Sequence, residues 1–134
     1  MLITRETDYA LRILRGLTDG QRHTMKTLCE AEQVPQQFAY KIIKKLALGG
    51  LVQNTRGVEG GCQLIADLKQ VSLYDLIALL EEGPRVSACM QPDYECAWKE
   101  CHGSDCRAHR KLAQLQQVLE RELRAFDLDS FIRE

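Results

Sequence analysis

A glycine-rich segment constrains the fold of this chain more than any other feature of its sequence. Residues 56–61, Arg-Gly-Val-Glu-Gly-Gly, hold three glycines among six residues and separate two expected strands at 51–55 and 62–66. Glycine supplies the backbone conformations of tight connections, so this pattern predicts a β-hairpin with a flexible tip. A chain of 134 residues has room for one domain, or for one small domain with an appended element, around such a hairpin.

Apolar residues at helical spacing predict three short helices before this hairpin. The first covers residues 7–19, and the second begins after a Thr24 cap and ends near residue 32. Pro35 favours the first turn of a third helix, which we expect to end near Leu48. Its expected inward residues are Phe38, Ile42, Ile43 and Leu46. Three short helices followed by a glycine-tipped hairpin is the order of a winged helix-turn-helix, in which the hairpin is the wing.

The remainder of the chain predicts a helix, an irregular segment and a long helix. Ser72 and Asp75 resemble a capping box, which opens a helix to about residue 82. From about residue 108, apolar residues at spacings of three and four form a narrow seam that suits a partner helix. They are Leu112, Leu115, Leu119, Leu123 and Phe126. After Asp127 we expect a short tail.

These elements predict a mainly α-helical fold with a small β-hairpin wing and a long C-terminal dimerisation helix. We expect three parts along the chain. They are a winged helix-turn-helix DNA-binding domain at residues 1–83, a cysteine-rich loop at 84–107, and a dimerisation helix with a tail at 108–134.

Charge is divided unevenly along the chain. Residues 1–56 carry 9 Lys and Arg against 5 Asp and Glu, whereas residues 57–134 carry 9 against 14. A basic N-terminal part suggests an anionic partner at that end. A winged helix-turn-helix places polar residues of its third helix at base edges and basic residues at phosphates, so we expect binding to double-stranded DNA. The candidate DNA-binding residues are Gln36, Gln37, Tyr40, Lys41, Lys44, Lys45 and Arg56.

Other function classes find little support in the sequence. We find no nucleophile–base pair, no phosphate-binding loop and no carboxylate pair at catalytic spacing, so an enzyme is not expected. The longest aliphatic run, residues 76–80, is far shorter than the roughly 20 residues that span a bilayer. The N-terminal residues do not resemble a secretory signal, which favours a reducing cytoplasm as the location.

Four of the six cysteines lie within residues 89–106, in the pattern Cys89-x6-Cys96-x4-Cys101-x4-Cys106. Zinc sites usually contain Cys-x2-Cys pairs, and this pattern has none. Wider spacing in an irregular segment is compatible with an iron–sulfur cluster, while zinc and a thiol–disulfide switch remain alternatives. His102 and His109 are nearby candidate ligands, and the remaining two cysteines, Cys29 and Cys62, are expected to be small buried hydrophobic residues.

Taken together, the motifs resemble the iron–sulfur-responsive winged-helix regulators, a family that includes IscR and NsrR. The similarity covers nearly the whole chain. The matching segments are Thr7-Asp8-Tyr9-Ala10-Leu11-Arg12 at the start, Gly49-Gly50-Leu51-Val52 with Arg56-Gly57-Val58-Glu59-Gly60-Gly61 at the wing, and the cysteine loop followed by a long helix.

The resemblance implies a homodimer with crossed C-terminal helices, a palindromic operator, and a 4Fe–4S or 2Fe–2S cluster held by three cysteines and a fourth ligand. Carried over to this sequence, the three cysteines are Cys96, Cys101 and Cys106. His109 resembles the fourth ligand of the 2Fe–2S members, and Asp8 resembles the aspartate that completes a 4Fe–4S cluster from the partner subunit. Cys89 departs from the family pattern and is a further candidate ligand.

From the residues and the resemblance we expect a dimeric transcription regulator, acting as a repressor, whose affinity for its operator depends on an iron–sulfur cluster. The cluster would sense redox state, nitric oxide, or cluster and iron status. The alternatives are a winged-helix regulator that uses the cysteines as a thiol switch or a zinc site, a protein that transfers electrons or clusters, and an adaptor whose winged helix binds protein.

Overall fold

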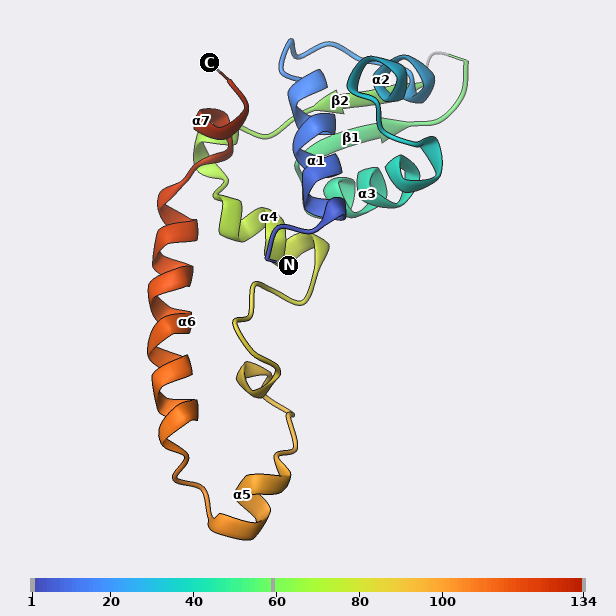
Figure 1. Ribbon diagram of the computed structural model, residues 1–134. Helices are drawn as coiled ribbons and strands as arrows, with labels where there is room; N and C mark the ends of the chain where they lie inside the picture. The colour runs from blue at the N-terminus through green and yellow to red at the C-terminus, as the bar shows by residue number, and fades with distance from the viewer. Residues whose placement is uncertain (1, 59, 134) are drawn as a thin grey trace.

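The computed structural model describes residues 2–58 and 60–133, so Glu59 of the wing lies outside the described residues, as do Met1 and Glu134 of the two terminal parts. The fold is mainly helical with one two-stranded antiparallel hairpin (Figure 1). Its elements are α1 (Arg5–Gly16), α2 (Met25–Glu32), α3 (Gln36–Leu48), β1 (Val52–Thr55), β2 (Gly61–Leu64), the 3-10 turn η1 (Leu68–Gln70), α4 (Leu73–Leu80), the 3-10 turn η2 (Ala88–Met90), α5 (Ala97–His102), α6 (Arg107–Ala125) and α7 (Leu128–Ile132).

Threonine caps set the starts of the first two helices. The Thr4 hydroxyl accepts a hydrogen bond from the backbone N–H of Thr7, so α1 begins two residues earlier than predicted and ends at Gly16. Thr24 accepts from the backbone N–H of Thr27 and caps α2, as the sequence predicts. Gln33 follows α2 in the left-handed backbone region, with φ 55°, and its backbone N–H bonds to the carbonyl of Cys29.

Two predictions about α3 need correction. Pro35 is the extended cap residue before α3 rather than a member of its first turn. Phe38 is 44% exposed and stacks at a tilt against Tyr9, with ring centroids 5.7 Å apart. The buried residues of α3 are Ala39, Ile42, Ile43 and Leu46. Position 38 lies just outside the helix face that these four residues define, so Phe38 is not part of the buried face.

The hairpin is anchored to the connection between α1 and α2. Val52 pairs with Leu64 and Thr55 with Gly61, which places the turn where the sequence predicts it. His23 exchanges two backbone hydrogen bonds with Cys62, of 2.9 and 2.7 Å, and so extends the sheet by one bridge. A Cβ at Gly61 would lie 2.5 Å from the carbonyl oxygen of His23, so only glycine permits this close approach.

The hydrophobic core lies between α1, α3 and α4, and it is closed by α2, the hairpin and the C-terminal end of α6. Both halves of the predicted capping box are present at the start of α4, where Ser72 and Asp75 each accept the other's backbone N–H. The helix ends at Leu80, two residues earlier than expected.

The C-terminal half forms a long hairpin of chain beside this compact part. In Figure 1 the chain descends from α4 through η2 to α5, turns, and returns along α6. Contacts with α4 and η2 support α6, and Leu123 near its end is buried. Leu115 in the middle of the predicted seam is 53% exposed. None of the described helices is long and apolar enough to cross a membrane.

Two short helices were absent from the sequence prediction. One is α5, within the segment predicted to be irregular. The other is α7, where a tail was expected. Backbone hydrogen bonds of 2.8 Å, from Leu73 to Phe126 and from Leu128 to Val71, draw the chain back onto η1, and the Leu128 side chain is fully buried there. The C-terminal segment is therefore part of the folded core rather than a loose tail.

Candidate nucleic-acid interface and cysteine arm

The outward face of α3 carries most of the predicted DNA-binding residues. Gln36, Gln37, Tyr40, Lys41 and Lys44 are all exposed. Within the described part of the chain, neither Lys41 nor Lys44 pairs with an acidic side chain. Both ammonium groups are thus available to an anion outside the protein.

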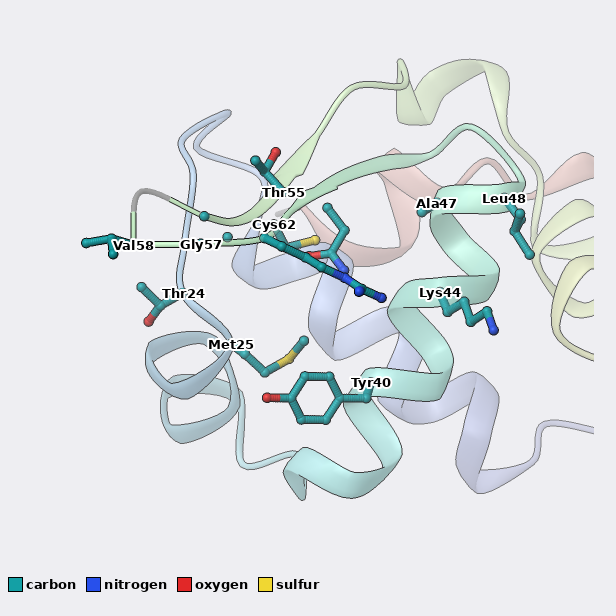
Figure 2. A pocket seen from close by; sticks show the side chains of 14 residues that line it. Thr24, Met25, Tyr40, Lys44, Ala47, Leu48, Thr55, Gly57, Val58 and Cys62 are labelled. Atoms are coloured by element: carbon teal, nitrogen blue, oxygen red, sulfur yellow. The ribbon is translucent and has the colours of Figure 1, made fainter.

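A groove of about 880 Å³ runs between α3, the start of α2 and the wing formed by β1, β2 and their connection (Figure 2). Arg56, directly after β1, lines the groove from the wing. Tyr40 and Lys44 lie on the α3 side. The structure therefore brings three of the predicted residues around one concave surface. Met25 and Leu48 also line it, and sequence reasoning did not single them out because apolar residues on short helices usually belong to the core.

Lys45 is directed elsewhere. Its Nζ donates to the Glu6 carboxylate at 2.6 Å and to the carbonyl of Leu80 at 2.8 Å. This links α3 to the first turn of α1 and to the last residue of α4. The predicted phosphate contact by Lys45 is therefore not supported by its position, and the lysine instead joins three helices of the folded domain.

The predicted cluster ligands lie mainly on residues 84–106, here called the cysteine arm. Cys89 lies in η2, which packs on α6. Cys96 immediately precedes α5, Cys101 lies within it, and Cys106 is the cap residue of α6. No three His, Cys, Asp or Glu residues within 2–58 and 60–133 are close enough together to hold a metal ion. A single protomer therefore does not bring the predicted ligands together.

One buried amide fixes the near end of the cysteine arm. Gln116 of α6 is only 8% exposed, and its Oε1 accepts the backbone N–H of Val86 at 2.8 Å. Its Nε2 donates to the carbonyl of Pro84 and to the carboxylate of Glu120. This Gln116 clamp holds the chain against the middle of α6 just before the first cysteine of the arm, and no sequence motif pointed to it.

The donor chemistry around Cys106 suits iron–sulfur ligation. The sulfur of Cys106 accepts the backbone N–H of His109 at 3.4 Å, and hydrogen bonds to sulfur are among the contacts that tune such clusters. The Nδ1 atom of His109 is buried without any hydrogen-bond partner among the described residues. An orphaned imidazole nitrogen one helical turn from a cysteine is a suitable metal donor.

Asp8 and Cys89 occupy different surroundings. Asp8 lies in the first turn of α1, outside the arm, and forms an ion pair with Arg12 at 3.1 Å. The sulfur of Cys89 is 3.4 Å from the hydroxyl oxygen of Ser87. Of the three candidate fourth ligands, only His109 presents a buried atom with no partner.

The other two cysteines are packing residues, as predicted. Cys29 and Cys62 are both buried in the core. Burial raises the pKa of the Cys29 thiol, and it raises that of Cys62 to about 11. Neither thiol is poised to form a thiolate at neutral pH.

Comparison with known proteins agrees with this geometry. The profile of the Rrf2 family, described as an iron-dependent transcriptional regulator, matches residues 3–134. Protein aau3 of Rhizobium meliloti strain 1021 is 25% identical over 123 residues, covering 90% of this chain and 80% of that protein. Oxidised CymR of Staphylococcus aureus superposes with a TM-score of 0.71 at 20% identity, covering 100% of this chain and 98% of the other. IscR of T. potens superposes with a TM-score of 0.70 at 16% identity, covering 97% and 85%.

The match spans the winged helix-turn-helix, the cysteine arm and α6. The chain therefore belongs to the Rrf2 family, and it is a DNA-binding transcriptional regulator, not an enzyme.

Proposed function

We propose that this protein is a homodimeric repressor that acts in the cytoplasm and binds a palindromic operator with an affinity set by an iron–sulfur cluster on the cysteine arm. The observation that carries the proposal is the placement of Cys96, Cys101 and Cys106. All three lie on a segment that connects the DNA-binding part to α6, and no residue of that segment belongs to the hydrophobic core. Ordering the arm around a ligand would thus act on the start of α6 without unfolding the core.

DNA binding in this proposal uses the groove and the exposed face of α3. Gln36, Gln37 and Tyr40 face base edges, while Lys41, Lys44 and Arg56 face phosphates. Lys45 is left out because its ammonium group is held by Glu6 and Leu80. Neutralised phosphates release counterions, so we expect affinity to fall steeply with salt.

Dimerisation in this proposal uses α6. Leu115 and Val118, near its middle, are about half exposed although the surrounding helix is strongly polar. Pairing with the same face of a second copy would bury them. Two α3 helices held in this way would meet half-sites about one helical turn apart, and a shift of α6 would change that spacing.

For the cluster itself, the three cysteines supply thiolates and His109 is the fourth ligand that the structure favours, with Asp8 and Cys89 as the alternatives to be tested. When bound, such a cluster would supply a centre that responds to redox state, nitric oxide or iron supply. The chain's own contribution is to hold the Cys106 sulfur and the His109 ring one turn apart at the start of α6.

The test is anaerobic purification followed by visible absorption and assays of iron and acid-labile sulfide per chain. Alanine at Cys96, Cys101 or Cys106 should abolish the chromophore, because loss of one thiolate opens a coordination site. Cys29→Ala is the matched control and should leave it intact. Among His109→Ala, Asp8→Ala and Cys89→Ala, we expect only the first to change the spectrum. A colourless protein containing zinc alone would refute the iron–sulfur proposal.

A thiol–disulfide switch is the second candidate, because four reduced thiols lie on the same arm, one of them exposed and three partly exposed. In that case operator affinity of the metal-free protein would change on adding oxidant and return on adding dithiothreitol. Operator affinity of the metal-free protein that stays the same with and without oxidant would refute the switch.

A further inference from the structure

We propose that the groove reads the methyl groups of thymine through Met25 and Tyr40, so that operator half-sites carry thymine at the position facing these two side chains. The inference rests on the DNA-binding part of the proposed function and is independent of the cluster. It assigns sequence selectivity to α2 as well as to α3.

The two side chains, Met25 from α2 and Tyr40 from α3, give part of the groove an apolar lining, here called the wall. Figure 2 shows the Tyr40 ring and the Met25 thioether turned toward each other beneath the wing. Tyr40 is 58% exposed, and no described residue hydrogen-bonds to its side chain. Met25 packs partly against the core and presents the rest of its side chain to the groove.

The cap of α2 fixes the position of this wall. Met25 is the first residue of α2, directly after Thr24. The Thr24 hydroxyl accepts from the backbone N–H of Thr27 at 3.2 Å and donates to the Thr27 hydroxyl at 2.9 Å. The start of the helix is therefore held in place by two hydrogen bonds. A contact made by the first residue of a capped helix varies little in position, which direct recognition of a base requires.

Charges around the wall indicate which part of DNA it would face. Lys44 on α3 and Arg56 on the wing line the same groove and can each engage phosphates. With the backbone of DNA held on these cations, the apolar wall of the same groove would face base edges. The C5 methyl of thymine is the apolar group that a base presents in the major groove.

A glutamine lies beside the wall on the same helix face. Gln37 is exposed and precedes Tyr40 by one helical turn. An amide side chain suits adenine, because it donates and accepts at once. Gln37 and the Met25–Tyr40 wall would together select for A·T pairs at neighbouring positions of a half-site.

The experiment begins by selecting high-affinity duplexes from a random library, using whichever form of the full-length protein binds DNA. Each thymine of the selected half-site is then replaced by uracil, which removes only the methyl group. At one position we expect a loss of about 4-fold per half-site, and roughly 15-fold when both half-sites are changed, from the value of one buried carbon.

Variants assign that loss to the wall. Met25→Ala and Tyr40→Ala should bind the thymine and uracil duplexes with nearly equal affinity. Tyr40→Phe should keep the difference, because the ring and not the hydroxyl makes the contact. Lys26→Ala, at the exposed neighbour of Met25, is the matched control and should keep the difference while weakening all duplexes alike.

Two results would overturn the inference. One is a selected consensus in which no uracil replacement lowers the affinity of the wild-type protein, a measurement that requires no variant. The other is an undiminished thymine preference in both Met25→Ala and Tyr40→Ala. Either result would leave the proposed operator binding in place, whereas failure to select any consensus would overturn operator binding together with this inference.

Discussion

The Gln116 clamp offers a direct test of how the cysteine arm is attached to the folded protein. Replacing Gln116 with leucine keeps the volume of the side chain but removes both of its polar atoms. The backbone N–H of Val86 and the carbonyl of Pro84 would then lose their partners. We expect Gln116→Leu to lower the free energy of unfolding substantially.

The magnitude follows from the burial of the two backbone groups. A polar group left buried and unsatisfied costs about 1–3 kcal/mol. The carbonyl of Pro84 and the Gln116 amide are buried, which places that loss in the upper part of the range, while the Val86 amide is only partly buried and belongs near the lower end. Together they give a loss of about 3–4 kcal/mol. The leucine itself adds little strain, because it is close to glutamine in size.

Urea denaturation followed by circular dichroism measures this loss, at one fixed protomer concentration because the proposed dimerisation would contribute to stability. Gln117 is exposed and adjacent on the same helix, so Gln117→Leu is the matched control and should change stability by less than about 0.5 kcal/mol. Equal effects of the two substitutions, or a Gln116→Leu loss below about 1 kcal/mol, would refute the clamp as an anchor of the arm.

Three further outcomes are expected. At pH 8, iodoacetamide should label the exposed Cys101 readily and Cys62 hardly at all in the native protein, because burial raises the pKa of Cys62 to about 11. Mass spectrometry of tryptic peptides measures the labelling of each cysteine. The hydrogen bonds that Asp19 accepts from His23 and from the backbone of Gln21 lower the pKa of its carboxyl group in the folded protein. The stabilisation from these bonds is therefore complete above the unfolded pKa near 3.8, and it is lost as the pH falls through the lower folded pKa. Denaturation curves between pH 6 and 2.5 should therefore show a smaller acid loss for Asp19→Asn than for the wild type. Ser72→Ala should reduce stability by about 1 kcal/mol in urea denaturation, because it removes one half of the capping box.

The sequence predicts best where local chemistry decides the structure. Three predicted features depend only on neighbouring residues, and the structure confirms each of them. They are the helix cap at Thr24, the Ser72–Asp75 capping box and the glycine-tipped hairpin. The sequence predicts less well where tertiary contacts decide. The C-terminal helix α7 is held in place because the Leu128 side chain is buried beside η1. No local sequence pattern predicts this tertiary contact.

The candidate sites show the same division. Helical spacing places Tyr40 and Lys44 on one outward face, and the structure agrees. The same spacing cannot reveal that Lys45 meets Glu6, because that partner lies 39 residues away in the chain. Nor can it reveal that Met25 borders the groove, since its exposure depends on how α2 meets the wing.

The hydrophobic core described above contains no residue between positions 81 and 118 among those that the structure describes. Substitutions across most of the cysteine arm therefore leave the packing of the DNA-binding part untouched, apart from those at the clamp. Mutation can explore new ligands, spacings or lengths of the arm at little risk to folding. Under the proposed function, a scaffold built in this way can acquire a different signal while keeping its operator, and it can change its operator while keeping its signal.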